Sequence, residues 1–453
     1  MANIFHACDI RGIAGTDLTL DKARQIGLAV GTKLMGKKVV VGGDVRLSTP
    51  ELQSTMVAAL AESGCDVFNI GTVASPAFYY ALQELEADGG VMVTASHNPA
   101  PYNGFKLVLG PGPVTEEEVA EIRAIVENGE FSSGFGCQRE YPLLADYIDH
   151  TVRKAAPAQE PLRVVVDAGN GAAALTAPRV LQSLGYEVIP LFCEPDGNFP
   201  NRAPNPALSE NLTALAAKVV ETGAALGIAF DGDGDRLGVV DETGRVISND
   251  KIMVLLARYY LAAKQGRIIY DAKCSMVVPE EIKKAGGEPI MGRAGHTFIK
   301  QAFLEQQALF GGELSGHFFF QELGYDDGLF AGLKVCELIA ANGKLSLQAD
   351  SVPDYLLTPD IRVTYHGSDK AEVIDEIAEK LQAYQPNRID GVRIEFNDGW
   401  AMIRSSVTEP LFTLRFEAKT QSRLREIAQI LLAALPGEVR ESVQAKLTEV
   451  EGF

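Results

Sequence analysis

The sequence predicts an α/β protein whose first three domains share one βαβαβ pattern and whose last domain is a smaller α+β unit. A run of strand, helix, strand, helix and strand occupies residues 38–96, and a similar order returns over residues 163–230 and 266–313. After about Tyr355 the pattern changes to short alternating strands around two helical stretches. The three copies are alike in hydrophobic pattern, although their residue identity is weak.

The elements of the first copy follow from its hydrophobic period. The apolar run KVVVGGD at residues 38–44 predicts a buried strand, and residues 49–64 have the three- and four-residue apolar spacing of an amphipathic helix. DVFNIG at residues 66–71 predicts a second strand, residues 76–87 a second helix, and GGVMVTAS at residues 89–96 a third strand. The unit is therefore βαβαβ.

The second copy begins with RVVVDAGNG in the segment of residues 163–192, continues with a helix around residues 212–223 and ends with the apolar strand AALGIAF at residues 224–230. The third copy has two helices between three strands, and in chain order these are predicted at residues 266–273, 279–286, 288–292, 296–306 and 308–313.

The last domain is predicted from the strand-like stretches IRVTY, VRIEF, WAMIRSS and LFTLRFEA, and SVPDY at residues 351–355 is a candidate linker before it. At 453 residues, of which 46% are hydrophobic, the chain is too long for one core and long enough for three or four domains. The predicted boundaries are residues 1–143, 144–246, 247–354 and 355–453.

Composition narrows the classes of function. The net charge is −19, from 60 acidic and 41 basic residues spread along the chain, which argues against non-specific binding to nucleic acid or to an anionic membrane. An anionic small substrate stays compatible with this charge, because a few clustered cations can make a positive pocket. The six cysteines have no metal-ligand spacing and are expected to be reduced thiols. The start MANIFHACDI has neither a basic nor an apolar leader region, so a cytoplasmic protein is expected.

Three polar loops follow the third strand of each copy. They are TASHNP, DGDGDR and GELSGH, in that order. Ligands collect at the carboxyl ends of parallel strands, so the three loops are expected to face one site if the copies surround a cleft.

The DGDGDR loop predicts a metal site. Asp231, Asp233 and Asp235 would repel one another unless a divalent cation neutralised them, and an oxygen-ligated cation such as Mg²⁺ is the simplest choice. An EF-hand calcium loop is the non-enzymatic alternative, because Glu242 stands at position twelve. However, Arg236 replaces the glycine needed at position six, and strands flank the loop. A solvated acidic turn is the third interpretation.

Ser96 in TASHNP has several interpretations. It could be a helix N-cap, or half of a Ser-His hydrolase dyad, although adjacent side chains in an extended chain point apart and no orienting aspartate follows. A phosphorylated serine fits better, because its charge of about −2 would be compensated by a metal on the acidic loop and by His97, Lys106 and Arg11. Ser96 would then store and donate a phosphoryl group.

TASHNP with the following YNGFK, DGDGDR, GELSGH and RSSVTEP together resemble the α-D-phosphohexomutase family, most closely its bacterial phosphomannomutase/phosphoglucomutase branch. The resemblance runs from DIRG at Asp9 to the last domain. It implies four domains around a deep cleft, the fourth similar to a TATA-binding-protein fold. It also implies an active phosphoserine at Ser96 and Mg²⁺ on Asp231, Asp233, Asp235 and a phosphoserine oxygen.

The implied reaction moves phosphate between the 1- and 6-hydroxyls of a hexose through a bisphosphorylated intermediate, with hexose 1,6-bisphosphate as the activator. Lys106 matches the family's candidate general base and Arg11 an active-site arginine. The implied catalytic set is Ser96, Lys106, Arg11, His97 and Arg236. Taken singly, Lys106 and Arg11 would more often be charged residues on the protein surface.

The resemblance also implies substrate contacts. Glu313, Ser315 and His317 match a sugar-recognition loop, whose plainer interpretation is a turn. His296 and Lys273 match positions that the family turns toward the cleft, although a structural histidine is the alternative for the first. Arg404, Ser406 and Thr408 offer a guanidinium and two hydroxyls that suit a phosphate dianion, and a polar turn is the alternative.

Two positions depart from the family pattern. Cys8 stands where tyrosine is usual and Val407 where asparagine is usual, which puts one cleft contact and one phosphate-loop contact in doubt. A glucosamine-phosphate mutase and a phosphoserine-dependent sugar phosphatase remain alternatives to a mannose or glucose phosphate mutase. The sequence does not indicate the preferred sugar or the oligomeric state.

Overall fold

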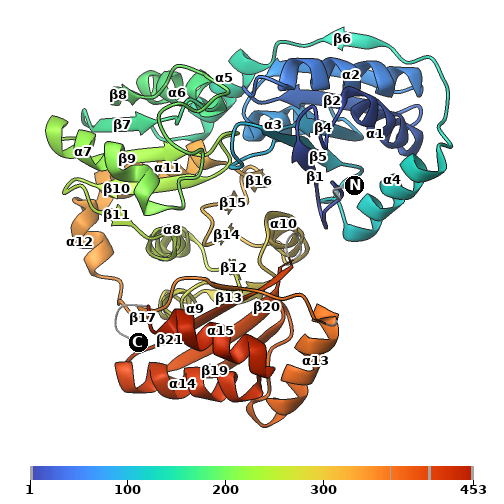
Figure 1. The fold of residues 1–453 in the computed structure, drawn as a ribbon. Coiled ribbons are helices and arrows are strands. Elements are labelled where there is room, and N and C mark those ends of the chain that lie inside the picture. The colour runs from blue at the N-terminus through green and yellow to red at the C-terminus, as the bar shows by residue number, and fades with distance from the viewer. Residues whose placement is uncertain (1–3, 368, 407–409, 450–453) are drawn as a thin grey trace.

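The computed structural model describes residues 4–367, 369–406 and 410–449, and over these residues the chain forms four sheets, one after another along the sequence (Figure 1). Three of the sheets mix parallel and antiparallel strands between helices, and the fourth is antiparallel. The prediction of three α/β domains followed by an α+β domain is therefore confirmed. No helix in the described part of the chain is both long and apolar enough to cross a membrane.

The first domain holds the sheet β1-β5-β4-β2-β3-β6. Its elements are β1 (Ile10–Ile13), α1 (Leu20–Lys33), β2 (Lys38–Gly43), α2 (Thr49–Glu62), β3 (Asp66–Thr72), α3 (Ser75–Glu84), β4 (Gly89–Val93), β5 (Tyr102–Val108), α4 (Glu116–Asn128) and β6 (Gln138–Glu140). The third strand of the copy is shorter than predicted: β4 ends at Val93, because the chain turns before it reaches Ser96.

The second and third domains follow the same plan. The second contains α5 (Leu144–Lys154), β7 (Arg163–Asp167), η1 (Ala172–Leu175), α6 (Ala177–Ser183), β8 (Glu187–Leu191), η2 (Ser209–Leu212), α7 (Thr213–Thr222), β9 (Leu226–Phe230), β10 (Leu237–Asp241) and β11 (Val246–Ile247). The third contains α8 (Asn249–Ala263), β12 (Arg267–Asp271), α9 (Val277–Lys284), β13 (Glu288–Gly292), α10 (His296–Glu305), β14 (Phe310–Gly312), β15 (Phe318–Phe320), β16 (Tyr325–Asp326), α11 (Gly328–Asn342) and α12 (Leu345–Asp350).

One topology recurs in these three sheets, which contain the strand orders β3-β2-β4-β5, β8-β7-β9-β10 and β13-β12-β14-β15. Counted along the chain, the first strand of each copy (β2, β7 or β12) pairs in parallel with the second and with the third. The fourth strand (β5, β10 or β15) runs antiparallel to the third. Each predicted functional loop is therefore the connection between the third and fourth strands of its copy.

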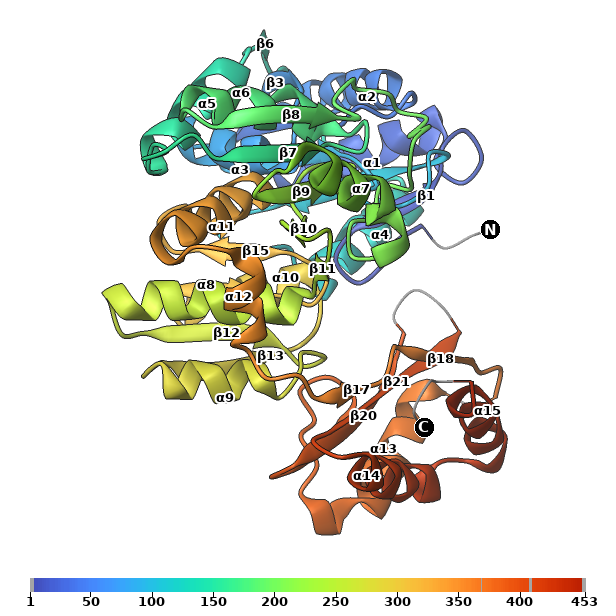
Figure 2. The same ribbon diagram turned by 90° about the vertical axis from the view of Figure 1, so that its left-hand side faces the viewer.

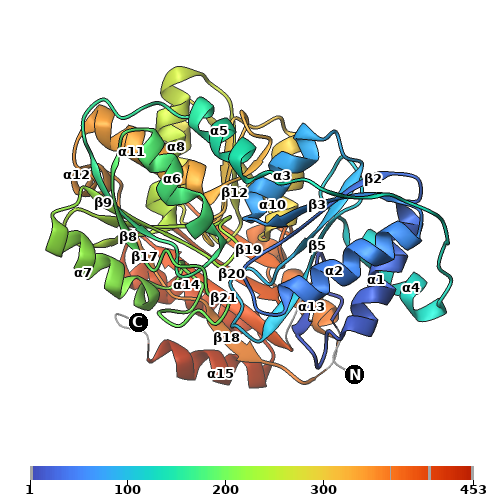
Figure 3. The ribbon, with the colours of Figure 1, turned by 90° about the horizontal axis from the view of Figure 1, so that it is seen from above.

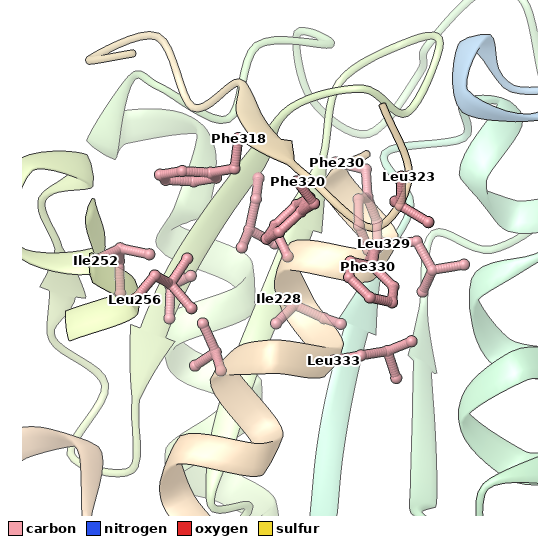
Figure 4. Packing of buried hydrophobic residues seen from close by; sticks show 14 of the residues in the cluster. Ile228, Phe230, Ile252, Leu256, Phe318, Phe320, Leu323, Leu329, Phe330 and Leu333 are labelled. Carbon is pink, nitrogen blue, oxygen red and sulfur yellow. The ribbon is translucent and has the colours of Figure 1, made fainter. Parts of the chain in front are cut away.

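A shared hydrophobic core joins the first three domains. Phe330 and Leu333 of α11 pack toward Ile228 and Phe230 of β9, so a helix of the third domain covers the sheet of the second (Figure 4). From above, the first and second domains lie side by side, with α3 next to α5 (Figure 3). Because burial of this apolar surface is favourable, the three functional loops are held in a fixed relation to one another.

The fourth domain has its own core and lies apart from the first two (Figure 2). Its elements are β17 (Leu356–Leu357), β18 (Ile361–Thr364), α13 (Lys370–Lys380), η3 (Gln382–Tyr384), β19 (Val392–Phe396), β20 (Gly399–Ser405), β21 (Leu411–Ala418), α14 (Gln421–Ala434) and α15 (Gly437–Leu447). Within the described residues it has three α-helices where two helical stretches were predicted, because the chain is extended at Leu435 and Pro436. Trp400 and Met402 pack on Ala272 of the third domain.

Candidate active site

The three polar loops meet in space. Ser96 Oγ donates a hydrogen bond to Asp231 Oδ2 at 2.7 Å, which joins the first loop to the second. The second loop reaches the third through the Leu237 amide, which donates to the Gly316 carbonyl at 3.0 Å. A cavity of about 260 Å³ opens here, and its lining includes Arg11, Ser96, Lys106, Arg236, His296 and His317. The expectation that the loops face one site is confirmed.

Ser96 lies in a turn before β5, so the helix N-cap interpretation is wrong. Its φ is +49°, in the left-handed region that non-glycine residues seldom adopt. The residue is 2% exposed, its amide donates to Thr94 Oγ1 at 2.9 Å, and its carbonyl accepts from Arg46 Nη2 at 2.7 Å. Such a strained conformation persists only where the surroundings fix it, and these two bonds fix both backbone groups.

Arg46 organises the whole serine loop, and the sequence analysis missed it. Its guanidinium is buried, pairs with Asp44 at 3.1 Å, and donates at 2.7–2.9 Å to four loop carbonyls, those of Ser96, Asn98, Pro99 and Tyr102. The only signal in the sequence is that DVR directly follows the first strand of the copy. A buried arginine with five donors can satisfy several carbonyls at once, which a lysine cannot.

His97 approaches the serine from the same side. Its Nδ1 is 3.3 Å from Ser96 Oγ, so the expectation that these neighbours point apart is wrong, because the left-handed turn at Ser96 is not an extended chain. The Arg236 guanidinium, with burial, lowers the pKa of His97 well below 6.5, so its ring is neutral at pH 7. No carboxylate among the described residues is hydrogen-bonded to His97, so the third member of a hydrolase triad is missing there.

The acidic loop is fully buried, and oxygens of Asp231, Asp233 and Asp235 lie within 4.8 Å of one another. Among the described residues, Asp233 Oδ1 and Asp235 Oδ1 have no hydrogen-bond partner. Unpartnered carboxylate oxygens are costly in a buried site unless a cation binds them. Together with Ser96 Oγ, they fit an oxygen-ligated divalent cation.

The calcium-loop interpretation is wrong, because β9 and β10 flank the loop where an EF-hand has helices. Its supposed twelfth ligand, Glu242, instead accepts hydrogen bonds from the Ser346 amide and hydroxyl. The solvated-turn interpretation is also wrong, because Asp231, Asp233 and Asp235 are all 0% exposed.

Lys106 supplies the nearest positive charge. It lies in β5, and its Nζ contacts Asp233 Oδ2 at 2.6 Å and Asp235 Oδ2 at 2.5 Å. Burial alone would lower the pKa of Lys106, but the two aspartates outweigh burial and raise it well above 10.5. In this arrangement the side chain is therefore an ammonium ion.

A polar chain connects the second loop to the third. Arg236 Nε donates to His317 Nε2 at 3.0 Å, so His317 carries its proton on Nδ1, 2.8 Å from Asp326 Oδ2. Asp326 Oδ1 is 2.9 Å from His296 Nε2. These groups and Asp235 form a second set that could hold a metal. However, His296 Nε2 and His317 Nδ1 are already hydrogen-bonded to Asp326. Asp326 was not predicted, and it lies in YDDG just before α11.

Glu313 and Ser315 form the remainder of the third loop. Glu313 Oε2 accepts from Ser315 Oγ at 3.1 Å, whereas Oε1 is buried without a partner among the described residues. Burial, and then the charge of Asp271, raises the pKa of Glu313 to about 8, so the carboxyl group is protonated at pH 7. It can therefore both donate to and accept from a hydroxyl group.

Arg11 and Cys8 line the first-domain side of the cavity. Arg11 in β1 pairs with Asp9 and donates to Asn98 Oδ1 at 2.8 Å, which links it to the serine loop. Burial raises the pKa of Cys8 to about 11, so it is a neutral thiol at pH 7.

Lys300 lines the opposite side and was missed, although it lies one turn after His296 in α10. Its Nζ is 3.8 Å from the centroid of the Tyr79 ring, and burial lowers its pKa to about 8. HTFIK places the histidine and the lysine four residues apart on one helix face, which was the available signal.

Three predicted residues of the fourth domain and its junction that the structure describes, Lys273, Arg404 and Ser406, are absent from the cavity lining. Lys273 Nζ pairs with Asp360 at 3.2 Å. Arg404 Nε contacts Asp390 Oδ2 at 3.0 Å, and Asp390 in turn accepts from the amide of Ala294 in the cavity wall at 3.3 Å. The Ser406 amide donates to the Leu411 carbonyl at 2.9 Å. Thr408 and Val407 lie outside the described residues.

Comparison with known proteins matches four family models in chain order. Residues 2–133, 145–244 and 248–355 match the phosphoglucomutase/phosphomannomutase alpha/beta/alpha domains I, II and III, and residues 359–434 match the C-terminal domain of that family. A phosphomannomutase/phosphoglucomutase of Pseudomonas aeruginosa is 40% identical over 438 residues, which cover 95% of this chain and 94% of that protein.

Two further relatives agree with this match. A phosphoglucomutase of Neisseria gonorrhoeae is 41% identical over 437 residues, which cover 94% of this chain and 95% of that protein. The crystal structure of a phosphoglucomutase/phosphomannomutase family protein from Burkholderia thailandensis superposes with a TM-score of 0.89 at 37% identity, covering 96% of this chain and 99% of the other.

Proposed function

This chain belongs to the phosphoglucomutase/phosphomannomutase family of enzymes, which interconvert hexose 1-phosphates and hexose 6-phosphates, and we propose that Ser96 is its phosphoryl carrier. The observation that supports this proposal is the contact of Ser96 Oγ with Asp231 at 2.7 Å, beside two unpartnered carboxylate oxygens. A hydroxyl in this position can exchange a phosphoryl group next to a bound cation.

Asp231, Asp233, Asp235 and an oxygen of phosphorylated Ser96 would hold Mg²⁺. When bound, the cation would withdraw charge from the phosphoryl oxygens and stabilise the transition state. Arg236 contributes a further positive charge, 3.8 Å from Asp231 Oδ2.

In the forward half-reaction a sugar hydroxyl oxygen attacks phosphorus and its proton passes to a base, while the bond from phosphorus to Ser96 Oγ breaks and Ser96 Oγ takes up a proton. Lys106 is the nearby candidate for the base, but it can accept a proton only after Asp233 and Asp235 have another cationic partner, because they hold it as an ammonium ion. In the return step, Ser96 Oγ loses its proton and attacks the other phosphoryl group of the bisphosphate, the bond from that phosphorus to the sugar oxygen breaks, and the sugar oxygen takes up a proton. The neutral ring of His97, 3.3 Å from Ser96 Oγ, can take the serine proton.

The sugar and its second phosphate would bind across the third and fourth domains. Glu313, Ser315 and His317 would contact the sugar hydroxyls, and His296 and Lys273 would complete the substrate site. Arg404, Ser406 and Thr408 would hold the phosphate that is not being transferred. Free hexose 1,6-bisphosphate would act as an activator, because it returns a phosphoryl group to an unphosphorylated Ser96.

Intact-mass analysis and a coupled assay with glucose 1-phosphate, mannose 1-phosphate and glucosamine 6-phosphate test this proposal. Wild type should carry a phosphate adduct and turn over glucose or mannose phosphate, whereas Ser96→Ala should lose both the adduct and most turnover. Ser54→Ala, an exposed serine of α2, is the matched control and should keep both. An active, unphosphorylated Ser96→Ala protein would refute the phosphoserine, and release of inorganic phosphate without isomer would indicate a phosphatase.

A further inference from the structure

Three aspartates occupy the same place in the three repeated domains. Asp44 directly follows β2, and Asp167 and Asp271 are the last residues of β7 and β12, which are the first strands of their copies. All three are at most 1% exposed. Each accepts a hydrogen bond from the amide two residues later, at 3.0, 2.8 and 2.6 Å respectively. The three carboxylates are therefore oriented by the same local turn.

In the first copy, the Asp44 carboxylate also accepts hydrogen bonds that connect it to the serine loop. Asp44 Oδ2 accepts from Thr94 Oγ1 at 2.7 Å, and Thr94 Oγ1 accepts from the Ser96 amide at 2.9 Å. The same carboxylate pairs with Arg46, which donates to the Ser96 carbonyl. Asp44 therefore reaches both backbone groups of the serine that has a left-handed φ.

The second copy uses the same device with one arginine. Asp167 Oδ2 accepts from Arg202 Nε at 2.8 Å, and Arg202 Nη2 donates at 2.8 Å to the carbonyl of Phe230, the residue before Asp231. Arg202 is also almost fully buried, with a side chain 5% exposed. The first metal-loop aspartate is therefore fixed from the central strand.

The third copy makes the connection directly. Asp271 Oδ2 accepts from the Leu314 amide at 2.7 Å, and Leu314 lies between Glu313 and Ser315 of the sugar loop. No arginine pairs with Asp271 in the described part of the chain.

We propose that Asp44, Asp167 and Asp271 are equivalent positioning residues, each of which holds the functional loop of its own domain. The inference rests on the proposed function and deepens it, since each aspartate supports a different part of the reaction. Asp44 positions the phosphoryl carrier, Asp167 the metal loop and Asp271 the sugar loop. Loss of one of these aspartates should therefore impair one part of the reaction and spare the other two.

Aspartate-to-asparagine variants of the full-length enzyme test this separation, because they keep shape but replace one accepting oxygen with a donor. Loss of a supporting group typically lowers activity or metal affinity about 10- to 100-fold. Asp44→Asn should lower kcat and the phosphorylated fraction of Ser96 by this factor. Asp167→Asn should raise the half-saturating Mg²⁺ concentration, and Asp271→Asn should raise KM, each by a similar factor.

Folded variants that all lose the same parameter, or that all match wild type, would overturn the proposal. If an asparagine variant does not fold, Thr94→Val, Arg202→Lys or Asp271→Ser replaces it and is judged by the same criterion. Amide hydrogen exchange separates this test from the proposed function. Exchange of the Ser96 amide should accelerate in Asp44→Asn and that of the Leu314 amide in Asp271→Asn, whether or not wild type is a mutase. Unchanged exchange rates of both amides in these variants would also overturn the proposal.

Discussion

Replacing Glu313 with glutamine should remove a large pH dependence from the stability of this enzyme. The folded protein raises the pKa of the Glu313 carboxyl from 4.5 to about 8, chiefly by burial. Ionising it in the folded state costs about 1.36 kcal/mol for each pH unit between these values, or about 5 kcal/mol in total. Glutamine keeps the size and a neutral side chain, so the variant has no such dependence.

The direction of the effect follows from proton binding. The folded protein holds the Glu313 proton more tightly than the unfolded chain, so the associated stability is complete below pH 4.5 and is lost as the pH rises to about 8. Relative to wild type, Glu313→Gln should therefore gain about 1.4 kcal/mol of unfolding free energy per pH unit through most of this window.

Urea unfolding at several pH values between 5 and 9 measures this difference. The sole tryptophan, Trp400, packs at the junction of the third and fourth domains and reports on unfolding there. Glu280→Gln is the matched control, because Tyr355 and Lys419 lower the pKa of Glu280 against the effect of burial, so that it stays ionised across this range. Parallel pH profiles for wild type and Glu313→Gln would refute the reasoning.

Three other outcomes are expected. Asp233→Asn should raise the half-saturating Mg²⁺ concentration about 10- to 100-fold, with partial recovery in excess Mg²⁺, and an unchanged Mg²⁺ titration would contradict a metal role. Arg404→Ala should weaken 1-phosphate and 6-phosphate substrates alike by about 1.5–3 kcal/mol, measured from kinetics in both directions, and should release more bisphosphate; impairment in one direction only would exclude a shared phosphate site. Lys300→Met should remove a rise in KM above pH about 8, where the Lys300 amine loses its charge; identical KM profiles would show that Lys300 does not contact the anionic substrate.

Hydrophobic period and loop chemistry, both local properties, allowed much of this protein to be predicted. The βαβαβ order of three domains, the α+β fourth domain and the three polar loops were all evident in short windows of sequence, because each element buries its own apolar face. The acidic loop DGDGDR by itself suggested a cation site, because three carboxylates so close together repel one another. The motifs then identified the family.

Contacts between distant segments were decided only by the tertiary structure. Arg46 reaches Ser96 across 50 residues and Asp326 reaches His296 across 30, and neither has a local sequence pattern that marks its partner. The left-handed turn at Ser96, which brings His97 to the serine, depends on those distant bonds and not on local preference. The sequence by itself determined which elements and reactive groups the protein has. Only packing decided which of them meet, because burial shifts a pKa or orients a donor through neighbours that the chain brings together from far apart.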